Sequence, residues 1–281
     1  MDDVDDPRRT RRLVLLDFPA LPGVRGVRAL GMAHEFERHV HESWCVGRMD
    51  AGGRLLELDG HTRIAPTGSV FVIPPGRPHA CRPAPGPEPA YRVACLSPAA
   101  LADVLAQIGP GPATLPAGVH HNPAAADALH ALFQAHQGDP LDQQECLLRL
   151  AAALAAPPAD PQDPEPAPPP GADPAVARAT TYLHDHLTDP VSLADLARHT
   201  GLGPWTLHRR FRRQTGITPH EYLVTLRVKH AAERLRHGAP PAEAAADAGF
   251  CDQSHLNRHF KRLTGLPPAT FARQQGEDES G

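Results

Sequence analysis

Two short segments in the C-terminal part of the chain carry Arg, His, Asn and Gln side chains at helical spacing. Residues 201–219 read GLGPWTLHRRFRRQTGITP, and residues 250–268 read FCDQSHLNRHFKRLTGLPP. Arg can form paired hydrogen bonds with guanine, Asn and Gln can do the same with adenine, and Arg and Lys neutralise phosphates. These residue types therefore predict recognition of nucleic acid.

The two segments are copies of one pattern. Four pairs of identical residues keep an offset of 49 positions: Leu207 and Leu256, Phe211 and Phe260, Thr215 and Thr264, and Pro219 and Pro268. The preceding glycines, Gly201 and Gly249, are 48 positions apart, so the second copy has one additional residue in its turn. A single basic helix is usually only a solvated surface, but two copies in register favour a shared function.

Each copy predicts a helix-turn-helix. In the first, Ser192 and Asp195 form a capping-box-like pair, Gly201 ends the helix, and a second helix runs from about Pro204 to Gln214. In the second, a helix that starts at Pro241 is broken by Gly249 and followed by another helix.

A longer helix, expected over residues 219–236, joins the two copies. Its 18 residues span about 27 Å at a rise of 1.5 Å per residue. With the bodies of the flanking helices added, the two copies would stand about 34 Å apart, one turn of B-DNA. One chain could then reach two successive major grooves.

The helical phase turns the Leu and Phe of each copy inward and a polar set outward. The predicted DNA-binding residues are Trp205, Thr206, His208, Arg209, Arg212 and Arg213 in the first copy, and Gln253, Ser254, His255, Asn257, Arg258 and Lys261 in the second. Residues near the start of each helix are expected to read bases. Arg212, Arg213 and Lys261 lie further along and are better placed for the phosphate backbone.

Charge supports this division of the chain. The formal net charge is −4, but residues 173–275 hold 14 Lys and Arg against 9 Asp and Glu, so they are basic and the remainder is acidic. A basic segment favours a polyanionic partner. The five cysteines form no CxxC pair, and we find neither a signal peptide nor a long apolar run. We therefore expect a cytoplasmic protein that does not interact with a membrane.

The domain organisation follows from changes in residue composition and hydrophobic periodicity along the chain. Residues 24–96 hold short β-prone runs broken by Gly and Pro, and residues 98–156 are helical in pattern. Residues 157–174 contain nine prolines and predict a linker. One apolar stripe recurs in the helical region at Leu141, Cys146, Leu147, Leu150 and Leu154. It would pack on its own domain or form the contact between two subunits.

The C-terminal part of the chain has a specific resemblance to a known protein family. Residues 175–273 resemble the DNA-binding domain of the AraC/XylS family of bacterial transcription regulators. The matching stretches are ADLARHTGL, WTLHRRFRRQTGITPHEYL, LRVKHAAERL, AADAGFCDQSHLNRHFKRLTGLPP and ATFAR. The resemblance implies two helix-turn-helix units in adjacent major grooves, with base-facing positions among the outward residues named above. It also implies contact with RNA polymerase and an effector-sensing front domain.

The front half carries a second set of chemically interesting residues, His39, His41 and His79. Together with the spacing of Gly68, Pro74 and Gly76 before His79, they resemble the two cupin motifs. Metal-binding cupins add a Glu, which is missing here. We therefore expect the three histidines to line an effector pocket and predict no metal, cofactor or catalytic residue. The alternative is a metal-dependent cupin enzyme, or a metal- or redox-sensing regulator, that uses these histidines.

The predicted fold is α+β with two domains. Residues 1–156 would form a cupin-like β-barrel with appended helices, in which residues 98–156 are a possible dimerisation segment. Residues 157–174 would be the linker, and residues 175–275 an all-α domain with two helix-turn-helix units. The predicted function is a DNA-binding transcription regulator, not an enzyme, that responds to an unknown small molecule. Its expected partners are promoter DNA and RNA polymerase, and a second copy of the chain is a further candidate.

Overall fold

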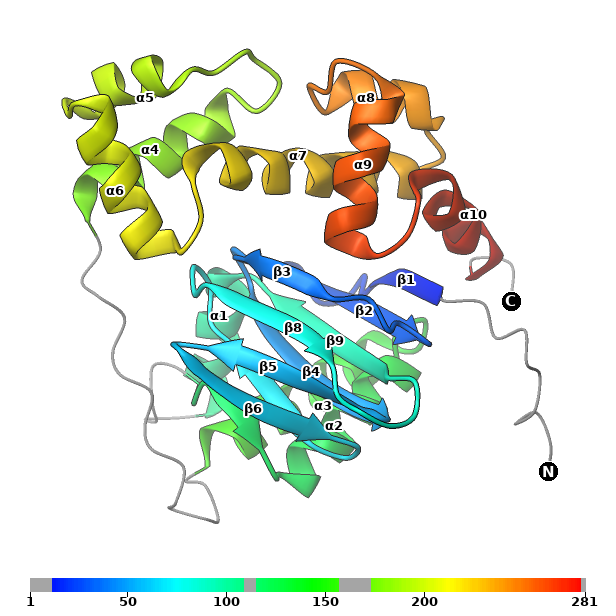
Figure 1. The fold of residues 1–281 in the computed structure, drawn as a ribbon. Coiled ribbons are helices and arrows are strands. Elements are labelled where there is room, and N and C mark those ends of the chain that lie inside the picture. The colour runs from blue at the N-terminus through cyan, green and yellow to red at the C-terminus, as the bar shows by residue number, and fades with distance from the viewer. Residues whose placement is uncertain (1–11, 109–114, 157–172, 279–281) are drawn as a thin grey trace. The chain divides into compact units, whose positions relative to one another are not determined.

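The computed structural model describes residues 12–108, 115–156 and 173–278. The chain divides into two compact units, the first formed mainly by residues before 167 and the second mainly by residues after it. The predicted linker, residues 157–174, lies outside the described residues except for Asp173 and Pro174, which begin a helix. The predicted two-domain α+β fold is confirmed (Figure 1).

Within the described residues, ten strands form two sheets. The strands are β1 (Arg12–Asp17), β2 (Val24–Leu30), β3 (Phe36–His39), β4 (Trp44–Ala51), β5 (Gly53–Leu58), β6 (His61–Pro66), β7 (Val70–Ile73), β8 (His79–Pro83), β9 (Ala90–Leu96) and β10 (Gly118–His120). The first sheet has the order β1-β2-β9-β4-β7-β10, and the second has the order β3-β8-β5-β6. Strands distant in sequence, such as β4 and β9, are therefore neighbours in space.

Alternation along the strands decides what each face of the six-stranded sheet contacts. On β4, Trp44 and Val46 join the core beneath the helices, whereas Cys45 joins a smaller cluster with Leu56 and Leu58 of the four-stranded sheet. The inner faces of the two sheets therefore meet, and we call the space between them the interior. This is the part of the fold in which we predicted an effector pocket.

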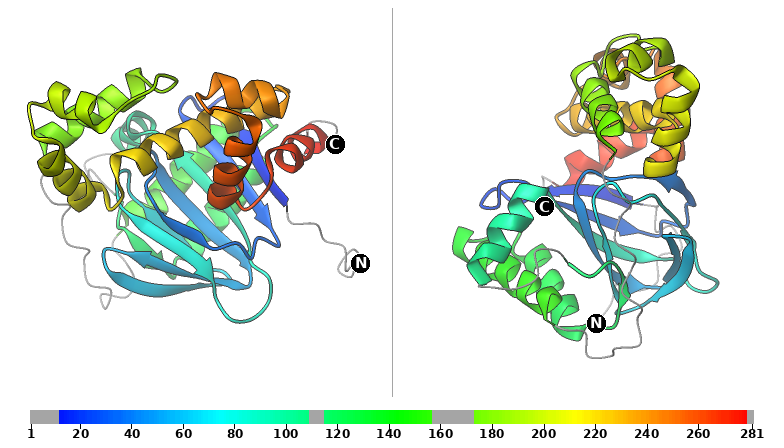
Figure 2. Two further views of the ribbon diagram at one scale, coloured as in Figure 1. Left: turned by 45° about the horizontal axis from the view of Figure 1, so that its top comes forward. Right: turned by 90° about the vertical axis from the view of Figure 1, so that its left-hand side faces the viewer.

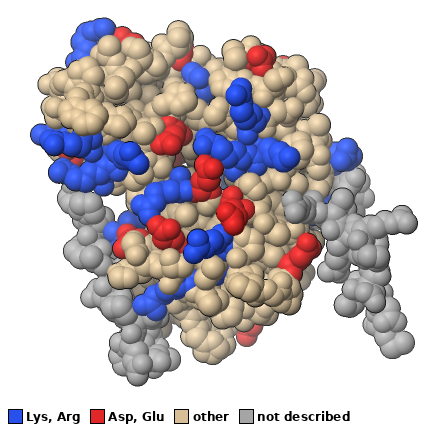
Figure 3. Space-filling model, in the orientation of Figure 1, with Lys and Arg blue, Asp and Glu red and all other residues tan. Residues whose placement is uncertain are grey.

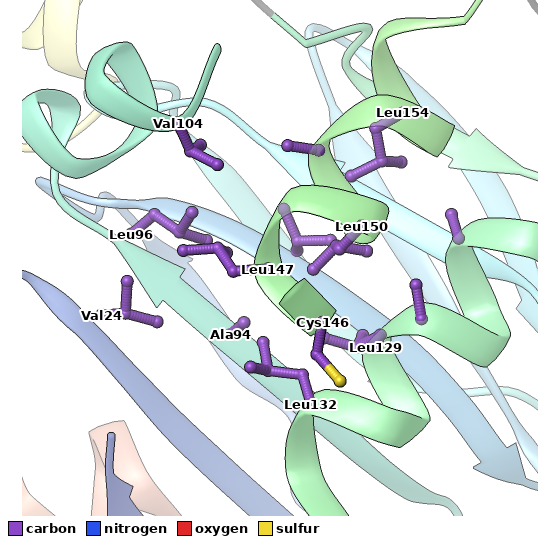
Figure 4. Close-up of a cluster of buried hydrophobic side chains, with 14 of the residues drawn as sticks. Val24, Ala94, Leu96, Val104, Leu129, Leu132, Cys146, Leu147, Leu150 and Leu154 are labelled. Atoms are coloured by element: carbon purple, nitrogen blue, oxygen red, sulfur yellow. The ribbon is translucent and has the colours of Figure 1, made fainter. Parts of the chain in front are cut away.

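Three helices cover the other face of the six-stranded sheet: α1 (Pro98–Ile108), α2 (Pro123–Gln134) and α3 (Pro140–Ala155) (Figure 2). The predicted apolar stripe is buried on this sheet at Cys146, Leu147, Leu150 and Leu154 (Figure 4). Leu141, which we had included in the stripe, is 62% exposed. Because the stripe is covered within the chain, a subunit contact through α3 would have to use another face of that helix.

The region predicted to be helical is interrupted. The strand β10 lies between α1 and α2 and pairs with β7 at the edge of the sheet. A three-residue edge strand takes its structure from its neighbour rather than from its own periodicity, and so the sequence pattern did not reveal it.

The second unit is helical throughout its regular elements. They are α4 (Pro174–Asp185), α5 (Leu193–Thr200), α6 (Pro204–Thr215), α7 (Pro219–Arg236), α8 (Pro241–Asp247), α9 (Gln253–Thr264) and α10 (Pro268–Asp278). The long helix α7 contacts α4 and α6 near one of its ends, and α8, α9 and α10 near the other (Figures 1 and 2). The predicted helix over residues 219–236 and both helix-turn-helix units are confirmed.

The duplicated sequence produces duplicated local structure. Each of the helices α6 and α9 ends at a left-handed glycine, Gly216 with φ 72° and Gly265 with φ 81°. The residue before each glycine, Thr215 or Thr264, donates its hydroxyl to the carbonyl four residues earlier at 2.8 Å. Both hydroxyls also bond the backbone two residues onward. The two helices therefore end in the same hydrogen-bonded turn.

The packing is duplicated as well. Four residues predicted to face inward have no exposed surface: Leu207, Phe211, Leu256 and Phe260. Phe211 contacts Tyr222 edge-on with ring centroids 5.6 Å apart, and Phe260 contacts Phe271 with centroids 5.3 Å apart. Tyr222 and Phe271 again stand 49 positions apart, so the repeat extends beyond the stretch that first revealed it.

In the described part of the chain, every helix is too short or too polar to cross a membrane.

Candidate nucleic-acid interface and effector site

The first set of predicted DNA-binding residues lies on α6, which we call the first recognition helix. Gly203 and Pro204 start this helix without a side-chain cap. Because Leu207 and Phe211 fix its buried side, the outer side is exposed at Trp205, Arg209, Arg212 and Arg213, and half-buried at Thr206 and His208. The predicted phase of this helix is confirmed; which of these residues touch DNA remains a prediction.

Trp205 is unusual among them because its large apolar side chain is 73% exposed. Its ring is stacked parallel to His208, with centroids 6.0 Å apart and an interplanar angle of 12°. The exposed indole is therefore accessible to a binding partner. In a major groove it would offer apolar contact to a thymine methyl group.

The second set lies on α9, the second recognition helix. Asp252 caps it by accepting a hydrogen bond from the His255 amide at 2.7 Å, and this backbone bond lowers the pKa of the Asp252 carboxyl. Five of the six predicted residues are exposed, namely Gln253, Ser254, Asn257, Arg258 and Lys261, and His255 is half-buried. The two recognition helices therefore have the same packing and the same terminal turn, but they expose different polar side chains.

His259, on the inner edge of α9, was not predicted. Burial first, and then the charges of Arg262, His255, Arg258 and His220, lower its pKa to about 4. It therefore stays neutral near pH 7 and adds no charge to the helix. Its ring lies 4.9 Å from that of His255, which in turn has Nδ1 3.2 Å from the Cys251 thiol.

A cavity of about 490 Å³ adjoins the first recognition helix and is lined by Asp173, Arg209, Arg210 and Arg213. Lys and Arg side chains gather on this part of the second unit (Figure 3). Arg210 lies 3.5 Å from the Asp173 carboxylate. Our sequence prediction omitted both residues, although the i, i+1, i+4 spacing of the three arginines could have indicated a shared site. Three guanidinium groups around one space favour a phosphate.

The three predicted histidines of the front half are brought together. One ring nitrogen from each of His39, His41 and His79 lies within 4.8 Å of the other two. The rings of His39 and His79 have centroids 4.3 Å apart, and His79 is 2% exposed. Burial lowers the pKa of His39 and lowers that of His79 to about 3, with the charges of His39 and Arg38 adding to the second shift. Both rings are therefore neutral near pH 7.

The hydrogen bonds of these rings define their tautomers. His39 Nδ1 lies 2.7 Å from the carbonyl of Glu37, and His79 Nδ1 lies 3.0 Å from the carbonyl of Arg77. Because a carbonyl only accepts, each Nδ1 carries the proton and each Nε2 carries the lone pair. A neutral imidazole whose other nitrogen donates to a carbonyl is the form that binds transition metals. The cluster therefore fits either a polar effector group or a divalent metal ion.

Comparison with known proteins agrees with both units. A family described as an AraC-like ligand binding domain matches residues 21–153, and a helix-turn-helix domain family matches residues 196–274. The chain belongs to the AraC family of transcription regulators. This regulator is 28% identical over 239 residues to the HTH-type transcriptional regulator YbfI of Bacillus subtilis, a match that covers 83% of this chain and 86% of YbfI.

A second relative matches the DNA-binding part alone. The HTH-type transcriptional activator RhaS of Escherichia coli is 37% identical to this regulator over 98 residues, which is 34% of each protein. Among solved structures, apo ToxT K231A from Vibrio cholerae has a TM-score of 0.62 and 10% identity, with 94% of this chain and 97% of ToxT covered. At that identity, the likeness shows a shared fold.

Proposed function

We propose that this regulator binds promoter DNA with its two recognition helices in successive major grooves, so that one subunit contacts both. The observation that carries the proposal is the duplicated scaffold. Helices α6 and α9 share the same terminal turn and the same buried Leu and Phe, and α7 joins them. Its 18 residues extend about 27 Å, and the bodies of the flanking helices bring the expected separation to about 34 Å, the spacing of adjacent major grooves.

The outward-facing residues of the two recognition helices divide by chemistry. Arg209 and Arg258 read guanine, Gln253 and Asn257 read adenine, and Trp205 contacts a thymine methyl group. Thr206, His208, Ser254 and His255 contact base edges or phosphates. Arg212, Arg213 and Lys261 bind the sugar-phosphate backbone, which gives affinity without sequence information.

For the front half, we propose that a small-molecule effector binds in the interior with a polar group at His39, His41 and His79. The closeness of the three imidazoles, with His39 and His79 neutral, supports this assignment because these rings offer hydrogen bonds without a fixed charge. Effector binding would shift the populations of DNA-binding and non-binding states. In this proposal the protein acts in the cytoplasm, contacts RNA polymerase and performs no catalysis.

A second candidate function rests on the same cluster. The tautomers of His39 and His79 suit a divalent transition metal, which a cluster of three imidazoles can hold with further positions left for solvent or effector. The regulator would then sense the metal, or an effector that binds the metal. Metal analysis of purified protein, with His79→Gln as the comparison, distinguishes the two candidates. Stoichiometric metal in the parent and its loss in the variant support the second candidate.

The test of the DNA assignment is footprinting of the full-length protein on genomic fragments. We expect two protected patches about 10 base pairs apart on one face of the duplex. Residues 175–275 alone should give the same pattern without effector, because both recognition helices lie in that segment. Protection of a single groove at saturating protein would contradict the paired arrangement.

A further inference from the structure

The interior of the first unit contains a pair of cysteine thiols that the regulator's DNA chemistry does not use. Cys45 on β4 and Cys95 on β9 are directly opposite each other in the antiparallel register, and their sulfur atoms lie 4.0 Å apart. Both belong to the cluster between the two sheets, together with Leu56, Leu58 and Ile73. Both are free thiols.

We propose that Cys45 and Cys95 form a peroxide-sensitive dithiol that closes to a disulfide inside the sensor unit. The backbone is already suited to the bond. A disulfide needs Cα atoms about 4.4–6.8 Å apart. Directly opposed residues of an antiparallel pair have Cα atoms about 4.5 or 5.5 Å apart, and both values lie in that window. Side-chain rotation alone can therefore bring the two sulfurs together.

The two thiols differ in access, and this sets the order of the reaction. Cys45 is 3% exposed, whereas Cys95 is partly exposed. The thiolate is the reactive form of a cysteine, and it must be reached by solvent and by the oxidant. Cys95 is accordingly the thiol that meets the oxidant, and Cys45 is the resolving thiol.

The chemical steps balance with a hydroperoxide as the oxidant. The Cys95 thiolate attacks one oxygen of hydrogen peroxide, the O–O bond breaks, and the second oxygen leaves as water after taking up a proton. The sulfenic acid on Cys95 is then attacked by the Cys45 sulfur, and a second water leaves. Two thiols and one peroxide become one disulfide and two waters. Two equivalents of a small thiol reduce the disulfide back to two thiols by exchange and are themselves oxidised to their own disulfide.

The disulfide would join β4 to β9 across the wall of the interior, beside Phe71 and Val93 of the same cluster. The space in which we place the effector would therefore change its lining on oxidation. The proposal does not rest on the DNA assignment, because it concerns thiol chemistry within one unit.

The experiment treats reduced full-length protein with hydrogen peroxide at one to ten equivalents, then alkylates it and measures the intact mass. We expect the loss of 2 Da and of two alkylation sites, with a Cys45–Cys95 cross-linked peptide after digestion. Dithiothreitol should restore both thiols. Because this measurement needs no substitution, it does not depend on how any variant folds.

Three variants assign the roles. In Cys45→Ser, Cys95 should stop at the sulfenic acid, which dimedone traps. In Cys95→Ser, the 2 Da loss should disappear. The matched control is Cys251→Ser, which removes the exposed thiol of the second unit and should leave the cross-link unchanged. The proposal is overturned if the parent forms no Cys45–Cys95 link, if peroxide links a different pair, or if Cys95→Ser still loses 2 Da.

Discussion

Replacement of Arg258 by Ala is the sharpest test of the orientation assigned to the second recognition helix. Arg258 is exposed, and its neighbours Leu256 and Phe260 are fully buried, so the substitution changes the outer side of α9 and leaves its core intact. Loss of a bidentate contact with guanine costs about 1–3 kcal/mol. The dissociation constant for the operator should therefore rise about 5- to 150-fold, while the free energy of unfolding changes by less than about 0.5 kcal/mol.

The assay is fluorescence anisotropy on a footprinted operator fragment and on a scrambled duplex of the same composition. The matched control is Arg234→Ala, which removes an identical charge from the same unit. Arg234 is committed to Asp247 at 2.7 Å and to Glu243 at 3.0 Å, so it serves the contact between α7 and α8. Its loss should cost stability, at most about 1 kcal/mol for a half-exposed pair, with little effect on operator affinity.

The possible binding results of the two variants distinguish base recognition by Arg258 from a general charge effect. Operator affinity equal to the parent in Arg258→Ala, with two grooves still protected, would mean that Arg258 does not face the bases. Equal weakening of operator and scrambled duplex by both variants would mean that Arg258 acts only through its charge. Weakening confined to the operator and to Arg258→Ala is the result that the helical phase requires.

Three further predictions follow from the two units. Arg213→Ala should weaken binding to all duplexes alike and lower the slope of log affinity against log salt by about one, because one phosphate contact is lost. An unchanged slope would show that Arg213 does not contact the DNA phosphate backbone. The pKa of His259 is lowered to about 4 by burial and then by Arg262 and other charges. The unfolded state therefore takes up the proton first, and stability that is complete above about pH 6.5 should fall as the pH decreases toward 4. Urea unfolding of His259→Gln should show a flatter pH dependence over that range, and an identical curve would contradict the assignment. Gly47→Ala would place a methyl group 2.0 Å from the Phe71 ring, so it should destabilise the first unit by about 1–3 kcal/mol. A thermal melt measures that loss, and Phe71→Ala in the same chain should recover part of it.

Local sequence determined most of the second unit. The 3.6-residue period places Leu207, Phe211, Leu256 and Phe260 on the buried side of two helices, and the caps and glycines that end those helices act over a few residues. Such interactions join residues within one or two helical turns of each other, so they can be predicted from the sequence alone. The helix boundaries and the inward residues were therefore predicted, as was the family through the motifs that they carry.

Tertiary structure decided what depends on contacts between distant residues. Strand order places Cys45 against Cys95, fifty positions away, and brings the three histidines to one point. Likewise, Asp173 meets Arg210 only because α4 packs near α6. Alternation in a strand specifies two faces but not the partner strand, and so the thiol pair could not be derived from periodicity. The spacing of the three arginines on α6 indicates a shared side of that helix, but it does not indicate that Asp173 lies beside them. These sites form because the burial of apolar surface brings together segments that are distant in the sequence.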